Sequence, residues 1–361
     1  MKGLLLAGGH GTRLRPLTFS GNKHMIPIAN EPMLFFGLRH LAEGGLSDVA
    51  VILGPLHEGI EEALGDGSSF GVRITYIHQG DPKGLAHAVL CARDFLGKEP
   101  FVMYLGDNML QEGTRSFIQQ FQENPCDAVV GVTPVSNPSS YGIAEMDGDR
   151  LVSIVEKPTV PRSNLALIGV YVFSPRIHPI IENLKPSRRG ELEITDAIWK
   201  LHEEQRTVRV RRVLGWWKDT GRPEDLLEAN DLVLNTMHTS CFTNQGTTSS
   251  GAKLHGLVRL GRGSFVASTA QIDGPAVIGN DVRIEGSVHL GPNVSIGNRC
   301  TLGRGSSVQR SIVMEDAVIE GSVTLSDCII GRNARILAEA DRTVHLSCIV
   351  GDSTRIRFAG T

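Results

Sequence analysis

Near the N-terminus an apolar run passes directly into a glycine-rich segment, Leu4-Leu5-Leu6-Ala7-Gly8-Gly9-His10-Gly11-Thr12-Arg13-Leu14-Arg15-Pro16-Leu17. The first four residues have the composition of a buried strand. Glycines that follow a strand allow backbone N–H groups to approach an anion closely. Arg13 adds a planar cation suited to phosphate oxygens, and Arg15 and Lys23 bring further positive charge. The stretch therefore predicts a phosphate-binding turn at the end of the first strand.

Short apolar runs alternate with amphipathic stretches as far as residue 132. We expect strands at 3–7, 49–53, 72–77, 101–105 and 128–132, and helices at 32–43, 56–64, 84–95 and 114–122. Such alternation is typical of an α/β domain in which helices cover a mostly parallel sheet. Ligands of these sheets bind at the carboxyl ends of the strands. We predict a Rossmann-like mixed, mostly parallel sheet in a domain that spans 1–235.

The C-terminal part of the chain repeats every six residues. Aliphatic residues recur at Ile278, Ile284, Leu290, Ile296 and Leu302, and a glycine follows four of them. This period indicates a parallel β-helix with the aliphatic side chains inside and glycines at turns that need positive φ. The repeat becomes irregular near 305–309, and all Trp and Tyr residues precede 235. We expect a linker rich in small polar residues at 236–252 and the β-helix at 253–361.

The composition excludes some classes of protein. The 361 residues include 36 Lys and Arg against 39 Asp and Glu, so a nucleic-acid binder driven by bulk positive charge is not expected. The first apolar run is too short for a membrane span or a signal peptide, which favours a cytoplasmic protein without membrane partners. The six cysteines show neither a C-x-x-C pair nor zinc-site spacing, and we expect reduced thiols.

The glycine-rich segment matches neither a Walker A loop nor the G-x-G-x-x-G dinucleotide fingerprint. Residues 8–18, followed by Lys23 and Pro27, instead resemble the G-G-x-G-T-R-L-x-P-L-T signature of the sugar-1-phosphate nucleotidyltransferase family. Within that family the chain is most similar to glucose-1-phosphate thymidylyltransferases with a hexapeptide-repeat domain. The resemblance extends over 1–235 and more loosely through the β-helix, which it implies is left-handed. It implies Mg²⁺-dependent nucleotidyl transfer from dTTP to glucose 1-phosphate, with release of pyrophosphate.

Two aspartates are candidate metal ligands. Asp107 is expected to follow a strand and Asp219 to lie in a tight turn, and two hard oxygen donors on separate elements suit one Mg²⁺. A lone Asp in such a place is more often a cap or turn former, but the resemblance implies that both bind the metal. Gln79 can pair with the imide edge of a pyrimidine, because its amide both donates and accepts. The nucleotide-binding set implied by the resemblance is Leu6, Ala7, Gly8, Gly9, Gly11, Thr12, Arg13, Gln79, Gly84 and Asp107.

A second group of residues resembles the family's sugar-phosphate site. Glu156 can accept hydrogen bonds from sugar hydroxyls, and Lys157 can neutralise the sugar phosphate as a compact charge. Glu191 is expected to support the pocket, and His24 is expected to pack. The set implied by the resemblance is Tyr141, Gly142, Glu156, Lys157, Asn164, Val170, Arg189 and Trp217.

The implied reaction needs no general base, because a sugar phosphate is already an ionised nucleophile at pH 7. Catalysis then consists of positioning and charge neutralisation. We expect Arg13, Lys23 and Lys157 to be the catalytic residues. Arg13 would hold the β and γ phosphates, Lys23 would stabilise charge at the α-phosphate, and Lys157 would hold the nucleophile.

Other interpretations stay open at this stage. UTP could replace dTTP, because one methyl group discriminates by only about 1–3 kcal/mol, and the hexose is not fixed. The β-helix could carry an acyltransferase site, for which His255, His289 and His345 are the candidate histidines. It could instead be a non-catalytic module for self-association. We expect a homo-oligomer formed through the β-helix or the catalytic domain.

Overall fold

The computed structural model describes residues 1–339 and 343–358. The chain forms two compact units. The sheet unit consists of Met1–His10 and Leu34–Asp219, and the β-helix unit consists of Gly11–Met33 and Thr220–Thr361. Part of the glycine-rich segment thus belongs to each unit.

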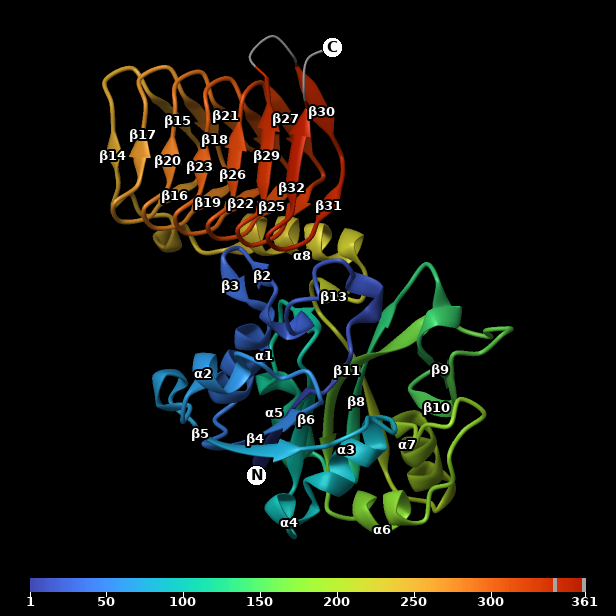
Figure 1. The fold of residues 1–361 in the computed structure, drawn as a ribbon. Coiled ribbons are helices and arrows are strands. Elements are labelled where there is room, and N and C mark those ends of the chain that lie inside the picture. Colours follow the sequence, from blue (N-terminus) through green and yellow to red (C-terminus); the bar gives the residue numbers. More distant parts are fainter. Residues whose placement is uncertain (340–342, 359–361) are drawn as a thin grey trace. The chain divides into compact units, whose positions relative to one another are not determined.

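The sheet unit is built on one nine-stranded mixed sheet (Figure 1). The strand order is β10-β9-β11-β6-β1-β4-β5, and β8 joins β11 to β12. The strands are β1 (Lys2–Ala7), β4 (Asp48–Leu53), β5 (Arg73–His78), β6 (Phe101–Leu105), β8 (Ala128–Pro134), β9 (Gly142–Asp147), β10 (Arg150–Glu156), β11 (Leu165–Phe173) and β12 (Val208–Arg212). The order β5-β4-β1-β6 is parallel, whereas β11 runs antiparallel to β6, β8 and β9. The predicted Rossmann-like mixed sheet is confirmed.

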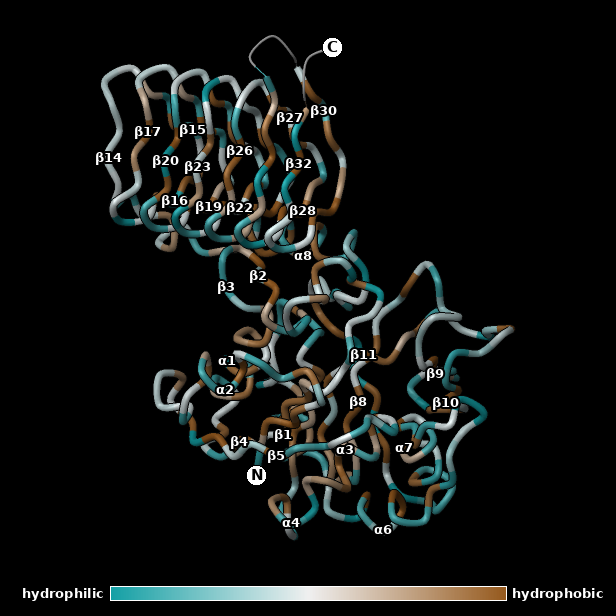
Figure 2. The backbone as a smooth tube through the Cα atoms, viewed as in Figure 1, coloured by the Kyte–Doolittle hydropathy of each residue, from teal (hydrophilic) through white to brown (hydrophobic). Residues whose placement is uncertain are grey.

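Short helices flank this sheet. They are α1 (Met33–Glu43), α2 (Ile60–Leu64), α3 (Leu85–Cys91), α4 (Arg93–Leu96), α5 (Arg115–Glu123), α6 (Ile177–Glu182) and α7 (Ile194–Glu203). The helix predicted at 56–64 begins only at Ile60, because Gly59 has φ 78°. The helix predicted at 84–95 is divided at Ala92, where φ is −88° and ψ is 4°. Figure 2 shows that the central strands are strongly hydrophobic, and they form the core with the inner helix faces. None of the helices among the described residues could span a membrane.

The β-helix unit stacks three parallel sheets around one axis (Figure 1). Its strands are β14 (Thr247–Thr248), β15 (Lys253–His255), β16 (Val258–Leu260), β17 (Phe265–Val266), β18 (Gln271–Asp273), β19 (Ala276–Ile278), β20 (Arg283–Ile284), β21 (His289–Leu290), β22 (Val294–Ile296), β23 (Thr301–Leu302), β24 (Ser307–Gln309), β25 (Ser311–Val313), β26 (Val318–Glu320), β27 (Val323–Ser326), β28 (Ile329–Ile330), β29 (Arg335–Ala338), β30 (Val344–Leu346), β31 (Ile349–Val350) and β32 (Arg355–Phe358). Each sheet takes every third strand. This is the predicted left-handed β-helix.

The repeating aliphatic residues fill the interior of the coils, where they are fully buried. Ile284 pairs with Leu302, 18 residues later, so one coil contains three six-residue repeats. Leu302 pairs with Ile319, 17 residues later. A coil that is one residue shorter accounts for the irregular repeat near 305–309.

The repeat glycines have a different role from the predicted one. Among the four that follow an aliphatic residue, only Gly291 has positive φ. Gly279 and Gly297 lie where successive coils approach closely, and a Cβ on Gly297 would lie 2.5 Å from the backbone nitrogen of Glu315. Non-glycine residues such as Asp281 and Arg299 have the positive φ values. The expectation that these glycines serve positive φ was therefore wrong for Gly279, Gly297 and Gly303.

One helix and the N-terminal segment of the β-helix unit pack against the coils. Helix α8 (Pro223–Thr236) contacts β22 and β25. The segment 11–33 contains the short strands β2 (Pro27–Ile28) and β3 (Glu31–Pro32). Asn230 of α8 accepts hydrogen bonds from the Ala29 backbone at 2.9 Å and from Ser295 Oγ at 2.7 Å. A buried amide thus joins the segment, the helix and a coil.

We predict that Gly297→Ala destabilises the β-helix unit by about 1–3 kcal/mol, because the new methyl group would overlap the next coil. Gly21→Ala is the control, since a Cβ at Gly21 would meet no atom within 4 Å. Differential scanning calorimetry should show a lower melting temperature for the first variant alone. Equal melting temperatures for both variants would contradict the close-approach explanation.

Candidate functional site

The residues that follow β1, β4 and β5 lie close together in the sheet unit: Gly8, Gly54 and Gln79. Leu6 and Ala7 are buried and pair with Leu105 and Leu53. A Cβ on Gly8 would lie 2.9 Å from Gln79 Oε1, and a Cβ on Gly54 would lie 2.3 Å from the Gly8 oxygen. The absence of side chains therefore lets the backbone of Gly8 approach both residues. Gly9, the next residue, is exposed.

Gln79 lies beside the start of α3. Its Nε2 is 3.1 Å from His87 Nδ1 and 3.3 Å from the Gly84 oxygen. Burial and then the charge of Lys83 lower the pKa of His87, so its ring is neutral at pH 7 and can accept from the amide. Gly84 has φ 102°, and a Cβ there would lie 2.4 Å from the Leu192 oxygen. The structure thus brings together Gly8, Gln79 and Gly84.

The two candidate metal ligands meet through a two-stranded sheet, β7 (Asn108–Leu110) with β13 (Trp217–Asp219). In its antiparallel register Asn108 is opposite Asp219. Asp107 directly precedes Asn108, so residues 112 positions apart in the chain are brought to the same end of this sheet.

Asn108 is a further candidate residue of this site that the sequence analysis did not identify. Its side chain is buried. Its Oδ1 accepts from Trp217 Nε1 at 2.8 Å and from the Gly169 nitrogen at 3.1 Å. Its Nδ2 lies 3.1 Å from Asp107 Oδ1. The amide therefore fixes the orientation of a candidate metal ligand. A polar residue that directly follows Asp107 in an apolar strand context was the available signal.

The network continues behind Asn108. Tyr104 is fully buried and donates from its hydroxyl to the Asn108 oxygen at 3.1 Å. His40 Nδ1 lies 3.2 Å from the same hydroxyl. Burial, and secondarily the charge of Arg39, lowers the pKa of His40 to about 4. The ring is therefore neutral at pH 7 and adds no charge behind Asp107.

The candidate sugar-phosphate residues form a second network in the sheet unit. Glu156 Oε1 lies 3.3 Å from Arg189 Nη1 and 3.7 Å from Lys157 Nζ, and its Oε2 accepts from Thr195 Oγ1 at 3.1 Å. Arg189 also pairs with Glu191 at 2.9 Å. Lys157 has positive φ, 42°. Glu193 Oε1 lies 3.2 Å from Arg189 Nη1, so two cations and three carboxylates are held within a short distance.

Aromatic and glycine residues border this network. Tyr141 and Trp217 make an edge-to-face contact with ring centroids 5.6 Å apart. A Cβ on Gly142 would lie 3.0 Å from Glu156 Oε2. Two weaker candidates have other surroundings: the Asn164 oxygen accepts from the Val135 nitrogen, and Val170 is fully buried in β11. Val170 therefore exposes neither its side chain nor its backbone to a ligand in this structure.

The remaining candidates belong to the β-helix unit. Gly11 has φ 62°, and a Cβ there would lie 3.0 Å from Lys23 Cβ, so these two residues are neighbours. Thr12 and Arg13 are exposed in a one-turn 3-10 helix. The Arg13 guanidinium lies against Gly221, where a Cβ would be 2.8 Å from Nη2. His24 is buried, with Nδ1 2.8 Å from Asn22 Oδ1.

The coils hold this cationic segment at several points. Arg332 Nη2 donates to the Met25 oxygen at 3.0 Å, and Ser20 Oγ donates to Asp352 Oδ2 at 2.7 Å. Asn30 Nδ2 donates to the Ile296 oxygen at 2.6 Å. No local pattern in the sequence signals these contacts between residues about 270 to 330 positions apart.

The matched family model fits this arrangement of strands, glycines and carboxylates. The nucleotidyl transferase model matches residues 2–236. The chain belongs to the nucleotidyl transferase family. A second model, the GMPPB C-terminal domain, matches residues 272–359. The protein is therefore an enzyme, a nucleotidyltransferase with a C-terminal β-helix.

Similar proteins cover the whole nucleotidyltransferase chain. A low-salt glycan biosynthesis nucleotidyltransferase, Agl11 of Haloferax volcanii, is 44% identical over 99% of this chain and 100% of its own. A glucose-1-phosphate thymidylyltransferase of Streptomyces griseus is 40% identical with the same coverage. A solved structure titled as a glucose-1-phosphate thymidylyltransferase of Bacillus anthracis with sucrose has a TM-score of 0.62 and 35% identity. It covers 66% of this chain and 96% of its own.

Nucleotidyltransferases of this family generally use a divalent metal ion. The donor chemistry beside the paired β7 and β13 strands fits such an ion, because Asp107, which directly precedes β7, and Asp219, at the end of β13, offer hard carboxylate oxygens. The three histidines considered for acyl transfer lie on β15, β21 and β30 of one sheet. His289 Nε2 is 2.6 Å from Asp273 Oδ2 and forms an exposed pair with it.

We predict that Asn108→Ala weakens divalent metal binding by about 10- to 100-fold, because Asp107 loses the amide that orients it. Stability should also fall by about 1–3 kcal/mol, since buried donors of Gly169 and Trp217 lose their acceptor. Free Mn²⁺ measured by electron paramagnetic resonance during titration gives the affinity. Asn124→Ala, which removes a bond to the Gln120 oxygen, is the control. Unchanged Mn²⁺ affinity in a folded Asn108→Ala protein would refute the orienting role.

We predict that Arg332→Ala lowers kcat by about tenfold or more, because small displacements of catalytic groups have effects of this size. In this hypothesis Arg332 positions the cationic segment through its hydrogen bond to the Met25 oxygen. Steady-state kinetics should show the loss mainly in kcat, with partial rescue by Arg332→Lys. Arg335→Ala, an exposed change in the same coil, should leave kcat unchanged. A melting temperature that falls while kcat is retained would indicate a structural role only.

Proposed function

We propose that this nucleotidyltransferase transfers a thymidylyl group from dTTP to glucose 1-phosphate and produces dTDP-glucose and pyrophosphate. The supporting observation is 40% identity to glucose-1-phosphate thymidylyltransferases across 99% of the chain. The juxtaposition of Gly8, Gln79 and Gly84 supports a nucleotide site. We also propose that 1–235 is the catalytic part, in agreement with the matched range 2–236, 236–252 the linker and 253–361 the β-helix.

The base would lie against Gln79 and Gly84. Gln79 Nε2 already donates to His87 and to the Gly84 oxygen, so Gln79 Oε1 would accept from the imide N–H of thymine. The hydrogen bond to His87 holds the side chain in one orientation. Because uracil has the same imide edge, these contacts favour pyrimidines and leave the thymine methyl group as the distinguishing feature.

The triphosphate would be held by the glycine-rich segment and its cations. Backbone N–H groups of Gly8, Gly9 and Gly11 can approach phosphate oxygens, because no side chain covers them. Arg13 would neutralise the β and γ phosphates, and Lys23 the charge that develops at the α-phosphate. Leu6, Ala7 and Thr12 would contribute backbone contacts.

Asp107 and Asp219 would hold Mg²⁺. When bound, the ion supplies positive charge that neutralises phosphate oxygens and orients them. The supporting role of this chain is to fix the two carboxylates, which the strand pairing and the Asn108 amide do before substrate binds.

Glucose 1-phosphate would bind in the network around Glu156. Glu156 would accept from sugar hydroxyls, whereas Lys157 and Arg189 would neutralise the phosphate. Tyr141, Gly142, Asn164, Val170 and Trp217 would line this site. A phosphate oxygen of the sugar attacks the α-phosphorus in line, the bond from the α-phosphorus to the bridging oxygen breaks, and that oxygen leaves on pyrophosphate. No proton transfer to a protein base is required.

The assembly and location of the enzyme also remain proposals. We propose a homo-oligomer that forms through the β-helix or the catalytic domain, and a cytoplasmic location. The exposed edges of the β-helix sheets support self-association.

We predict that pyrophosphate release from glucose 1-phosphate is faster with dTTP than with UTP, CTP, ATP or GTP, and that EDTA abolishes it. Asp107→Asn and Asp219→Asn should each lower kcat by at least about 100-fold, because each removes a charge that the metal needs. Asp147→Asn, at the end of β9, is the control. A strong preference for UTP would keep the reaction type and change the product. No release with any nucleotide would refute the assignment to glucose 1-phosphate.

A further inference from the structure

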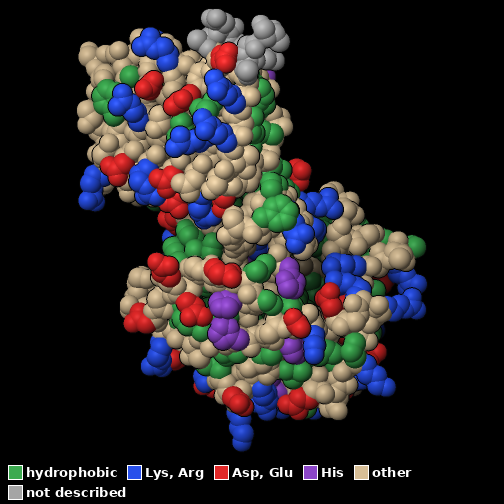
Figure 3. Space-filling model, viewed as in Figure 1, with side chains coloured by type: hydrophobic (Ala, Val, Ile, Leu, Met, Phe, Trp, Pro, Cys, Tyr) green, Lys and Arg blue, Asp and Glu red, His purple; other side chains and the backbone are tan. Residues whose placement is uncertain are grey.

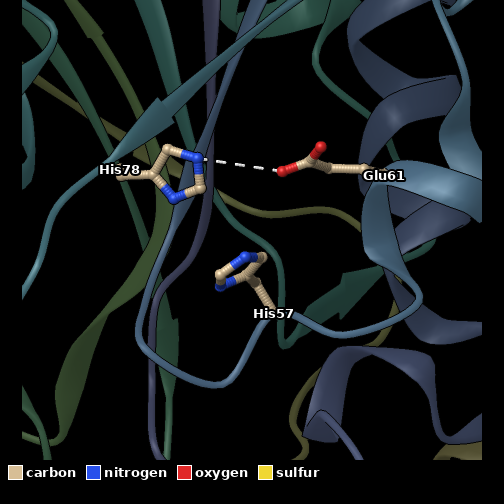
Figure 4. A group of neighbouring side chains, drawn as sticks. All are labelled: His57, Glu61 and His78. Carbon is tan, nitrogen blue, oxygen red and sulfur yellow. Dashed lines mark ion pairs between the residues drawn. The ribbon is translucent and has the colours of Figure 1, made fainter.

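A cluster of two histidines and one glutamate lies outside the site described above. His57 precedes α2, Glu61 belongs to α2, and His78 ends β5 (Figure 4). One ligand atom from each lies within 4.8 Å of the other two. Within residues 1–339 and 343–358, this is the one group of three or more His, Cys, Asp and Glu side chains close enough to share an ion.

His57 is held in the state that a metal requires. Its Nδ1 lies 2.9 Å from the Gly54 oxygen. A carbonyl oxygen can only accept, so Nδ1 carries the proton and Nε2 has its lone pair available. A backbone carbonyl behind the ring is a common support of metal-ligating histidines, because it fixes both the tautomer and the ring orientation.

The other two ligands are separated by a suitable space. His78 Nε2 lies 3.8 Å from Glu61 Oε1, which is longer than a hydrogen bond. In a tetrahedral site with bonds of about 2.0–2.1 Å, neighbouring ligand atoms are about 3.3 Å apart. Small side-chain rotations would therefore complete the geometry. The rings of His57 and His78 already converge, with centroids 4.9 Å apart at an angle of 71°.

The cluster is accessible from solvent. The side chains of His78 and Glu61 are 60% and 48% exposed. Figure 3 shows histidine side chains at the surface of the sheet unit, with acidic side chains near them. An ion can thus reach the three ligands without opening the fold.

We propose that His57, Glu61 and His78 bind one Zn²⁺ ion, with water in the fourth position. Two imidazoles and one carboxylate suit zinc, whereas Mg²⁺ prefers oxygen ligands alone. This site differs in its chemistry from the carboxylate pair Asp107 and Asp219.

The cluster is directly connected to the nucleotide-binding residues. Gly54, which supports His57, packs against Gly8, and His78 directly precedes Gln79. Zinc would therefore link the loop after β4 to the end of β5 and restrain the backbone of Gln79. This second part rests on the proposed function. It implies that zinc changes KM for dTTP more than it changes kcat.

The first experiment measures Zn²⁺ alone on the metal-free, full-length protein, in competition with a chromogenic chelator. We predict that His57→Gln, Glu61→Gln and His78→Gln each weaken one site per chain by more than about tenfold. Glu62→Gln changes the next exposed residue of α2 and should bind as the unaltered chain does. Zn²⁺ should raise the melting temperature of the unaltered chain and of Glu62→Gln only.

The outcomes separate the zinc site from its consequence. The proposed site would be overturned if the unaltered chain did not bind Zn²⁺. It would also be overturned if folded His57→Gln and His78→Gln bound Zn²⁺ with the affinity of the unaltered chain. The melting temperatures of the metal-free variants show whether they fold. In a second experiment, KM for dTTP is measured with Mg²⁺ present, with and without Zn²⁺. An equal response of the unaltered chain and His78→Gln would overturn the link to Gln79. A failure of pyrophosphate release would refute the proposed function and leave the zinc titration untouched.

Discussion

A buried amide, that of Asn108, is the interaction on which the candidate metal site depends. Its oxygen satisfies the Gly169 nitrogen and the Trp217 indole, and its nitrogen holds Asp107. A buried amide with unsatisfied groups is costly, so the three elements that supply its partners must come together at once. The same arrangement fixes the register of β7 with β13 and hence the position of Asp219. The hydrogen bonds that satisfy the buried Asn108 amide therefore also place the carboxylates of Asp107 and Asp219.

The β-helix packs with a segment that lies within the range 1–235 proposed to be catalytic. Gly11–Met33 belongs to the same compact unit as the coils. Met25, Ser20 and Asn30 each bond to a different coil. The segment has little regular structure of its own, so tertiary contacts must supply its rigidity. A module considered for acyl transfer or for self-association therefore also restrains the residues proposed to bind phosphate. The boundary proposed at residue 235 divides the chain into consecutive segments. The compact units of the structure differ from it, because Gly11–Met33 belongs to the unit that contains the coils.

Periodic patterns in the sequence predicted most of the helices and strands. Exact helix ends and the role of the repeat glycines depended on single backbone angles and on contacts between distant residues. The five expected strands and the six-residue repeat were readable because burial imposes a period on the chain. The helix boundaries at Gly59 and Ala92 depended on single backbone angles. Gly279 and Gly297 were identified as special, but the reason lies in the neighbouring coil. Strand β11, which reverses the direction of the sheet, came after the predicted alternation had ended. In the site, motifs indicated Asp107 and Gln79, and the residues that orient them lie close to them in the chain. Only the partners that hold Asn108, Gly169 and Trp217, are distant, and no local pattern indicates them.

The two groups of proposed metal ligands in the sheet unit would separate cations by ligand chemistry. Asp107 and Asp219 offer only hard oxygens, and phosphate oxygens of a substrate would complete such a set. His57 and His78 offer nitrogen, whose affinity rises toward the later divalent metals. Affinity alone would favour zinc at the carboxylate pair as well as at the histidine cluster. Magnesium is selected where the protein supplies few ligands and where phosphate oxygens and water complete the coordination shell. A separate imidazole site would take up the more tightly binding metal. Asp107 and Asp219 would then remain available to bind Mg²⁺, the ion that neutralises phosphate oxygens in the proposed reaction.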